Sequence, residues 1–375
     1  MMFVDPTSRA VVANQADAEG RLRKRDGVYV GTLPPSENVA NTATRWAGVR
    51  WTMIRWPLPD DPRERARLMA HELWHRIQDE LDLPASNPAN RHLDTLEGRL
   101  WLQLEWRALA AALRSQGEQR RSAVADAVFF RRYRYSLFPD AQREERLLEV
   151  HEGLAEYTGV AAGTRNAAEA VELALANLSS APQHPTFVRS FSYATGPALG
   201  LLLDAADPGW RKRISARSDL GALLARAYRI EPADDFVTKA KQRAAAYGFE
   251  TLQAAEGKRE RDRQARLSRY RSRLVDGPTL RIPLFRMNVQ FNPQTLVPLG
   301  ESGTVYPTLR ITDVWGVLTV DDGALLTKDW STVYVAAPRN TTGETIEGSG
   351  WRLVLKPGWT IRPRGDAGDY LLARE

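Results

Sequence analysis

The sequence predicts an α+β fold: a small N-terminal β region, a mainly helical middle part and a C-terminal all-β sandwich or barrel. Three observations predict it. Strand-like runs stand at 28–30 and 42–56, apolar residues recur at helical spacing over 62–270, and residues 279–375 alternate short apolar runs with Gly, Pro, Asn and Asp. We therefore expect a β region at 1–59, packed on a helical domain at 60–275, and a separate β domain at 279–375.

Composition narrows the classes of protein and of site. The chain is 43% hydrophobic and 26% charged, which is ordinary for a globular protein, and it has no apolar run long enough to span a membrane. Its net charge is +6, but Arg is spread among Glu and Asp along the helices, so we expect a solvated surface and no nucleic-acid partner. Because the chain has no cysteine, any metal ligands must be His and carboxylate residues.

The N-terminal region is expected to contain a strand at 28–30 and a hairpin over 42–56 with Ala47-Gly48 at its turn. This hairpin directly precedes the helix that carries the first motif. A strand in that place can pair with an extended peptide, which makes Trp46, Gly48 and Val49 candidate substrate-binding residues. A purely structural hairpin explains the pattern equally well, and both interpretations stay open.

The first motif is His71-Glu72-Leu73-Trp74-His75, inside a helix predicted over residues 62–82. His71 and His75 are four residues apart and therefore lie on one face of that helix. Two neutral imidazoles so placed can bind one zinc ion, and Glu72 then reaches the metal-bound water as general base. Two histidines hydrogen-bonded to neighbours on an amphipathic helix are the alternative.

Further helices follow this motif. Leucines repeat at helical spacing from Leu93 to Leu104, a second helix is expected over 119–135, and both apolar stripes are interpreted as core. His92 follows a loop rich in Pro and Asn, so we expect a surface or capping residue rather than a ligand.

The second motif lies in a helix predicted over 141–158, which places Glu149, Glu152 and Glu156 on one face. Three carboxylates on one stripe repel each other unless solvent or a cation is present. A catalytic zinc held by two histidines takes a third protein ligand, for which Glu152 is the candidate. Glu156 is placed to accept a hydrogen bond from the free ring nitrogen of a zinc-bound His. An acidic, solvated helix face is the alternative.

Together, H-E-L-W-H at 71–75 and E-G-L-A-E-Y at 152–157 resemble the motifs of gluzincin metallopeptidases, with thermolysin-type enzymes and neutral aminopeptidases as the nearest models. Carried over residue by residue, the resemblance implies that His71, His75 and Glu152 are the zinc ligands. It also implies that Glu72 is the general base and that Glu156 is the acidic residue behind the ligands. His151 stands where these families usually have Asn. The two motifs are also separated by 76 residues, far more than in those families, which indicates inserted helices and a distinct family.

A third stretch, 192–196, is expected to open an apolar helix at 197–203. It is similar to the Y-x-x-G helix start of neutral aminopeptidases, where the Tyr hydroxyl hydrogen-bonds the tetrahedral intermediate. The similarity implies Tyr193 as transition-state stabiliser, and a Tyr that packs on its own helical turn is the alternative. An aminopeptidase also needs a carboxylate for the substrate's α-amino group, and Glu149 is the candidate.

The remaining sequence predicts one long charged helix over 236–274 and then the C-terminal β domain, which contains no His and no catalytic cluster. We predict a zinc-dependent hydrolase of peptides or proteins. Endopeptidase and aminopeptidase activity both stay open, as does the oligomeric state. The alternatives are an inactive zinc-binding scaffold whose β domain binds a partner, and a metal-free helical module. A secreted or periplasmic location is favoured if a signal peptide has been removed.

Overall fold

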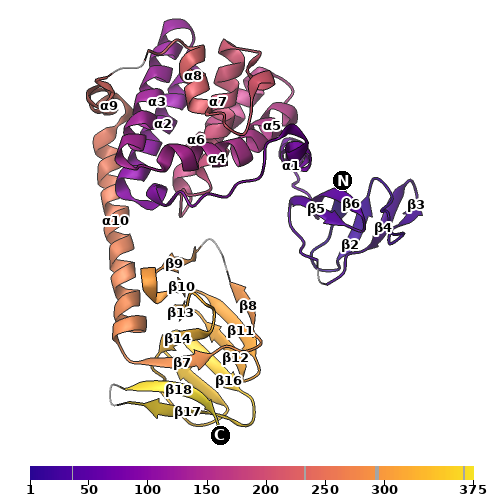
Figure 1. Ribbon diagram of the computed structural model, residues 1–375, viewed down its shortest axis with the longest axis vertical. Helices are drawn as coiled ribbons and strands as arrows, with labels where there is room; N and C mark the ends of the chain where they lie inside the picture. Colours follow the sequence, from indigo (N-terminus) through magenta and orange to yellow (C-terminus); the bar gives the residue numbers. More distant parts are fainter. Residues whose placement is uncertain (36, 232–233, 292–294, 366–367) are drawn as a thin grey trace. The chain divides into compact units, whose positions relative to one another are not determined.

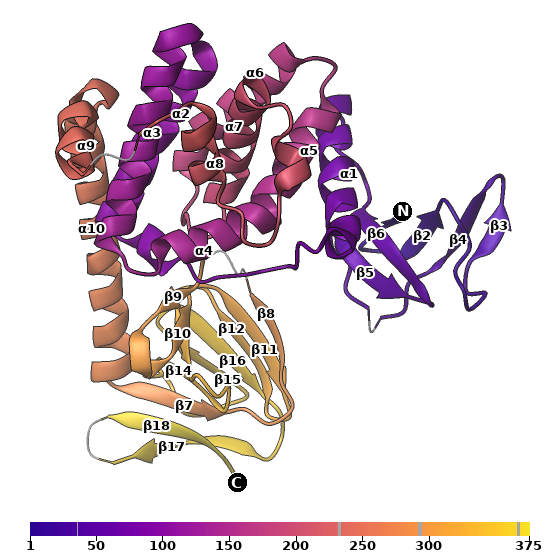
Figure 2. The same cartoon turned by 45° about the horizontal axis from the view of Figure 1, so that its top comes forward.

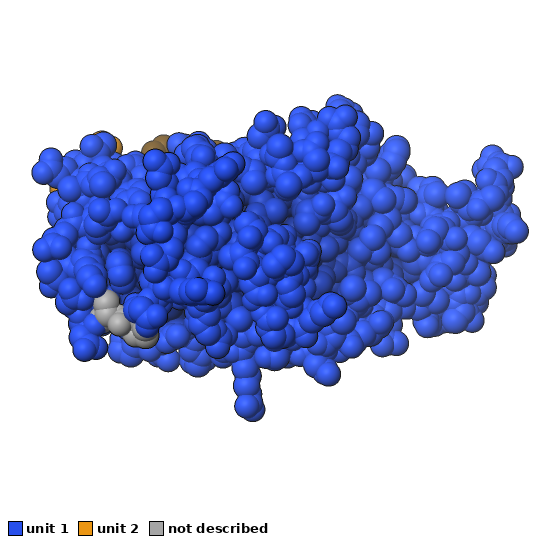
Figure 3. All heavy atoms as spheres, turned by 90° about the horizontal axis from the view of Figure 1, so that it is seen from above, with its two compact units in different colours: residues 1–256 blue, residues 257–375 orange. Residues whose placement is uncertain are grey.

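The computed structural model describes residues 1–35, 37–231, 234–291, 295–365 and 368–375. It divides into two compact units, Met1–Glu256 and Gly257–Glu375, which Figure 3 shows in different colours. The predicted α+β class is confirmed: the first unit holds a small β region and a helical body, and the second is built mainly from β-strands (Figure 1).

A six-stranded sheet with the order β3-β4-β2-β1-β6-β5 forms the N-terminal β region. Its strands are β1 (Met2–Val4), β2 (Ala10–Ala13), β3 (Arg23–Arg25), β4 (Val28–Thr32), β5 (Thr42–Trp46) and β6 (Val49–Arg55). The predicted hairpin is present as β5 and β6, with Trp46 opposite Val49 and a two-residue turn in which both residues have positive φ. Because β6 also pairs with β1, β5 is the edge strand on this side of the sheet.

The helical body supplies most of the first unit. Its helices are α1 (Pro62–Ile77), α2 (Leu96–Arg114), α3 (Gly117–Leu137), α4 (Ala141–Leu148), α5 (Leu154–Gly163), α6 (Ala167–Ser180), α7 (Phe191–Ala206), α8 (Leu220–Ala227) and α9 (Phe236–Ala244), followed by α10 (Phe249–Arg271). Their apolar faces share one core, which includes Leu104, Trp106, Phe130 and Leu199. Helix α1 packs against α5 and also against β5 and β6 (Figure 2).

The helix predicted over 141–158 is not a continuous α-helix. Helix α4 ends at Leu148, the turn Glu149–Gly153 is π-helical, and the N–H of Leu154 bonds back to the carbonyl of Glu149. A π turn inserts one extra residue and rotates the residues after it relative to those before it. The spacing of the three glutamates therefore does not place all of them on one face.

The prediction of a single helix over 236–274 is also wrong. Helix α9 ends at Ala244, a 3₁₀ turn covers Ala245–Tyr247, and Gly248 adopts a left-handed conformation with φ of 72° before α10 begins. Glycine ends a helix in this way because it has no Cβ to clash with the preceding turn.

The second unit contains two sheets with the orders β17-β18-β7-β14-β13-β10-β9 and β15-β16-β12-β11-β8. Its strands are β7 (Thr279–Pro283), β8 (Asn288–Phe291), β9 (Val297–Pro298), β10 (Thr304–Tyr306), β11 (Leu309–Asp313), β12 (Gly316–Val320), β13 (Ala324–Leu326), β14 (Thr332–Ala336), β15 (Thr345–Gly348), β16 (Trp351–Leu355), β17 (Trp359–Arg364) and β18 (Asp369–Arg374). Ile282 and Leu353, one from each sheet, belong to a common core.

The division between the units falls at Glu256, inside α10, whereas the sequence suggests a boundary near 275. The end of α10 packs with the β-strands, because Tyr270 and the following Leu274 share a buried cluster with Val305 and Leu325. Among the described residues, no helix combines the length and the apolar character needed to cross a membrane.

Candidate metal centre

Three helices meet closely at the two sequence motifs. A Cβ added to Gly159 or Gly163 of α5 would lie 2.8 Å from backbone atoms of Arg67 in α1, so these glycines allow the two helices to approach. A Cβ on Gly196 of α7 would lie 2.3 Å from the carbonyl oxygen of Gly153. The glycines thus bring α1, the π turn and α7 together, which places the two motifs side by side.

Three ligand-type atoms converge between these helices. The Nε2 atoms of His71 and His75 are 3.1 Å apart, and Oε2 of Glu152 lies 3.6 and 3.5 Å from them. Within the described residues, this is the group of His and acidic side chains with the geometry to hold a metal ion. The circle through the three atoms has a radius of about 2.0 Å, which matches the length of a zinc–nitrogen or zinc–oxygen bond.

The other ring nitrogen of each histidine has an acceptor of its own. Nδ1 of His71 is 2.9 Å from Oε2 of Glu156, and Nδ1 of His75 is 3.0 Å from Oε1 of Gln78. Because these oxygens accept, each Nδ1 carries the proton and each Nε2 keeps its lone pair. Glu156 thus accepts from a motif histidine, as the sequence suggests. Gln78 was not predicted as the second acceptor, although its position three residues after His75 was a signal.

This arrangement concentrates electron pairs that repel each other. Two lone pairs 3.1 Å apart beside a carboxylate need a positive charge between them. An extra proton is one solution: burial lowers the pKa of His71, but its hydrogen bonds to Glu152 and Glu156 outweigh burial and raise the pKa to about 9. A divalent cation is the solution that engages all three atoms at once. The donor set therefore fits a zinc ion.

Glu72 has a buried carboxylate that is not fully hydrogen-bonded. Its side chain comes from the same helix as the two histidines, and its Oε2 atom has no hydrogen-bond partner among the residues that the structure describes. Burial raises the pKa of Glu72. A buried carboxylate oxygen without a hydrogen-bond partner is costly for stability.

Helix α7 and the loop before it supply two donors to Glu152. The Tyr193 hydroxyl donates to Oε2 of Glu152 at 2.6 Å, and the Tyr193 ring stacks on His71 with centroids 5.5 Å apart. Burial, followed by the charge of Glu152, raises the pKa of Tyr193 well above its usual value, so the phenol keeps its proton. Arg189 donates to the second oxygen of Glu152 at 3.1 Å. The sequence offered no signal for Arg189.

A third imidazole, His151, lies beside this group. Its Nδ1 is 2.7 Å from the carbonyl oxygen of Ser86, so Nδ1 donates there, and its ring centroid is 5.0 Å from that of His75. Arg189 also donates to Asn87, the next residue of the same loop. His151 and Arg189, which both lie beside the centre, are therefore tied to one loop.

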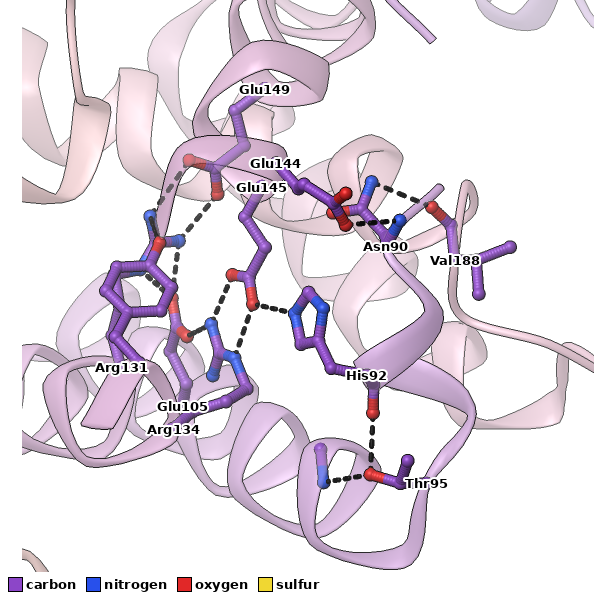
Figure 4. A network of polar contacts seen from close by, with 12 residues as sticks. Asn90, His92, Thr95, Glu105, Arg131, Arg134, Glu144, Glu145, Glu149 and Val188 are labelled. Atoms are coloured by element: carbon purple, nitrogen blue, oxygen red, sulfur yellow. Dashed lines mark hydrogen bonds and ion pairs between the residues drawn. The ribbon is translucent and has the colours of Figure 1, made fainter. Parts of the chain in front are cut away.

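Glu149 does not join the other two glutamates, contrary to its predicted place on their face. Arg131 donates to its two carboxylate oxygens at 2.9 and 2.6 Å (Figure 4). The π turn directs Glu149 toward α3, while Glu152 and Glu156 face α1. Glu149 is thus a member of a separate, buried polar network and is not available to hold a substrate amine.

This buried network joins α2, α3 and α4 through charged side chains (Figure 4). Arg131 also donates to Glu105 at 2.8 Å, and Arg134 donates to Glu145 at 2.7 and 2.5 Å. His92 lies 2.8 Å from Glu145 and is buried, so its predicted surface position is wrong. The reason is a long-range one, since the partner of His92 is 53 residues away.

We expect Arg134→Met to destabilise the fold by about 3–5 kcal/mol, because it leaves buried glutamates without their counter-charge. Urea unfolding followed by circular dichroism measures this loss. Arg143→Met is the control, since Arg143 forms an exposed ion pair with Asp140 and such pairs contribute about 0–1 kcal/mol. Equal losses in the two variants would contradict a structural role for the network.

The network also predicts a pH dependence of stability. Burial, more than the opposing charge of Arg131, sets the pKa of Glu149 and raises it to about 7. A carboxyl group with a raised folded-state pKa binds its proton more tightly when folded, so stability falls as pH rises from the unfolded pKa, about 4.3, through 7. With a metal chelator present, the melting temperature of Glu149→Gln relative to that of the wild type should rise between pH 5 and pH 8. A constant difference over that range would rule out this titration.

The three predicted substrate-binding residues lie at one end of the N-terminal hairpin. Trp46 is buried in the core of the small sheet, and its carbonyl accepts from the indole of Trp51. A Cβ on Gly48 would meet Ala18, which packs over the turn. The Trp46 side chain therefore serves the sheet itself, and the free edge beside α1 belongs to β5.

A scan against protein-family models, a search of curated proteins and a search of solved structures each found no match for this chain. The function is therefore inferred from the chemistry of the residues.

Proposed function

We propose that this protein is a zinc-dependent metallopeptidase of gluzincin type. The observation that carries the proposal is the convergence of His71, His75 and Glu152 on one point, with acceptors behind both histidines that leave both Nε2 lone pairs free. Together with Glu72, whose Oε2 atom has no hydrogen-bond partner in the described ranges, this arrangement offers three ligands and a base.

The proposed mechanism assigns a task to each side chain. A bound zinc ion would supply Lewis-acid polarisation of the substrate carbonyl and a lowered pKa for water. Glu72 accepts the proton of the attacking water and returns it to the leaving amine. Tyr193 keeps its proton, and its hydroxyl, which donates to Glu152 in this structure, turns to donate that hydrogen bond to the oxyanion instead. Arg189 orients Glu152, and Glu156 orients His71.

An extended peptide is the substrate class that the surroundings support. The edge strand β5 runs beside α1, and an unpaired strand edge can add a further strand through main-chain hydrogen bonds. Each carboxylate grouped with the histidines already has a task, and Glu149 is bound to Arg131. With no candidate carboxylate left in the described site for a substrate α-amino group, endopeptidase activity is favoured over aminopeptidase activity.

Metal analysis and peptide turnover test the proposal together. We expect about one zinc per chain in the purified protein, hydrolysis of an internally quenched peptide library, loss of hydrolysis with a chelator and recovery with added zinc. Zinc without turnover of any peptide would support the alternative of an inactive zinc-binding scaffold. Protein without zinc affinity would overturn both.

Tyr193→Phe is expected to lower kcat by about 10- to 1,000-fold with a much smaller change in KM, because the lost donor acts on the transition state. Steady-state kinetics with one quenched peptide measures both constants. Tyr157→Phe is the matched control, since the Tyr157 hydroxyl donates to Asp204 at 2.6 Å and not to Glu152. Wild-type kinetics in Tyr193→Phe would remove this residue from the mechanism.

A further inference from the structure

A cavity lies between α3 and α8, and no histidine lines it. It has a volume of about 600 Å³, within the usual range for small-molecule pockets, roughly 300–1,000 Å³. Residues of α3, the start of α4, α8 and the segment after α8 line it, and none of them belongs to the candidate metal centre.

One part of the wall is apolar. Val128 of α3 lines the cavity together with Ala222, Ala225 and Ile230, and the cavity surface is mostly apolar overall. Gly221 brings α8 close to α3 here, because a Cβ at this position would lie 2.7 Å from Cδ of Arg131. This wall suits a hydrocarbon chain better than a polar ligand.

Arg131, a member of the buried polar network in Figure 4, also lines the cavity. Arg131 directs its N–H groups to Glu105, to Glu149 and, at 3.4 Å, to the oxygen of Tyr135. With its donors occupied, Arg131 is a fixed part of the wall and not a ligand-binding group.

Tyr135 has a donor left over at the same place. Its hydroxyl oxygen accepts from Arg131, and no described residue accepts the hydroxyl proton. Burial raises the pKa of Tyr135 well above its usual value, so this proton stays in place. A phenol that lines a cavity and has an unused donor is suited to a ligand that accepts hydrogen bonds.

The remaining lining carries more positive than negative charge, since three arginines outnumber the carboxylates of Asp219 and Glu231. Arg132, Arg226 and Arg229 line the cavity, and none of them has a carboxylate within ion-pair distance in the described ranges. Asp219 is occupied, because it caps α8 through Ala222 and accepts from Gln142. These arginines therefore favour an anion over a neutral or cationic ligand.

We propose that this cavity binds a medium-chain fatty acid. The hydrocarbon chain packs along the apolar wall of α3 and α8, and the carboxylate accepts hydrogen bonds from Tyr135 and from the arginines of the lining. The site goes beyond the proposed peptidase function, and its occupancy does not depend on zinc or on hydrolysis.

Isothermal titration calorimetry of the full chain with decanoate tests the proposal, with methyl decanoate as the ligand that lacks a charged head. We expect saturable one-to-one binding of decanoate and at least tenfold weaker binding of the methyl ester. Tyr135→Phe and the double variant Arg226→Ser/Arg229→Ser should each weaken decanoate binding roughly tenfold. Arg165→Ser, which changes an exposed arginine just before α6, is the control and should bind as the wild type does.

Ala225→Trp fills the cavity and should abolish binding, with circular dichroism to check that the variant folds. If it does not fold, the two surface arginine substitutions still decide the outcome. Three results would overturn the proposal: no decanoate binding by the wild type, equal binding of acid and ester, or wild-type affinity in the folded Ala225→Trp and double-arginine variants.

Discussion

Glu72→Gln should abolish peptide hydrolysis and leave zinc bound. The amide has nearly the shape of the carboxylate but cannot accept a proton, so the attacking water loses its base. Loss of general base catalysis costs typically about 10²- to 10⁴-fold in rate. Turnover of a quenched peptide and metal content, measured on the same preparation, give the two values that the prediction needs.

Glu80→Gln is the matched control, because Glu80 is an exposed acid just after α1. It should keep both zinc and activity. Retained hydrolysis in Glu72→Gln would remove Glu72 as the base. Loss of zinc together with activity would instead indicate that Glu72 supports the metal.

The second large effect is expected for Glu152→Ala, which removes one of the three converging atoms. Substitution of residues behind metal ligands typically weakens metal affinity by about 10- to 100-fold, so loss of a ligand should exceed 100-fold. Competition with a chromogenic zinc chelator measures the affinity. Glu156→Gln should fall in the smaller range, because it removes only the partner of His71.

Glu149→Gln distinguishes this assignment from the sequence-based expectation of three glutamates on one face. Since Glu149 binds Arg131 and not the histidines, its substitution should leave zinc affinity unchanged. Unchanged zinc affinity in Glu152→Ala, or a large loss in Glu149→Gln, would mean that the third ligand is wrongly assigned.

Features that depend on neighbours in the chain were predictable. The α1 helix follows from apolar spacing and from an aspartate before a proline, and the structure shows Asp61 as its N-cap. The two-residue turn of the hairpin at Ala47-Gly48 follows from its strand pattern in the same way. Local periodicity also separates the helical body from the C-terminal strands, because helices and strands repeat at different intervals.

Features that depend on distant partners were not predictable. The π turn at Glu149–Gly153 changes the face on which Glu149 lies, and Arg131, which binds that carboxylate, is 18 residues away. Arg189 reaches Glu152 across 37 residues, and His92 reaches Glu145 across 53. No spacing rule covers such pairs, since they form only when separate helices pack.

The sequence by itself determined the two motifs, the helix that presents both histidines on one face, and the order of β and helical regions, because these follow from local geometry. The tertiary structure decided which two of the three glutamates face the histidines and which side chains set the histidine tautomers. The physical reason is packing: glycines allow α1, the π turn and α7 to approach, and the buried arginines then bind Glu149 on the opposite side.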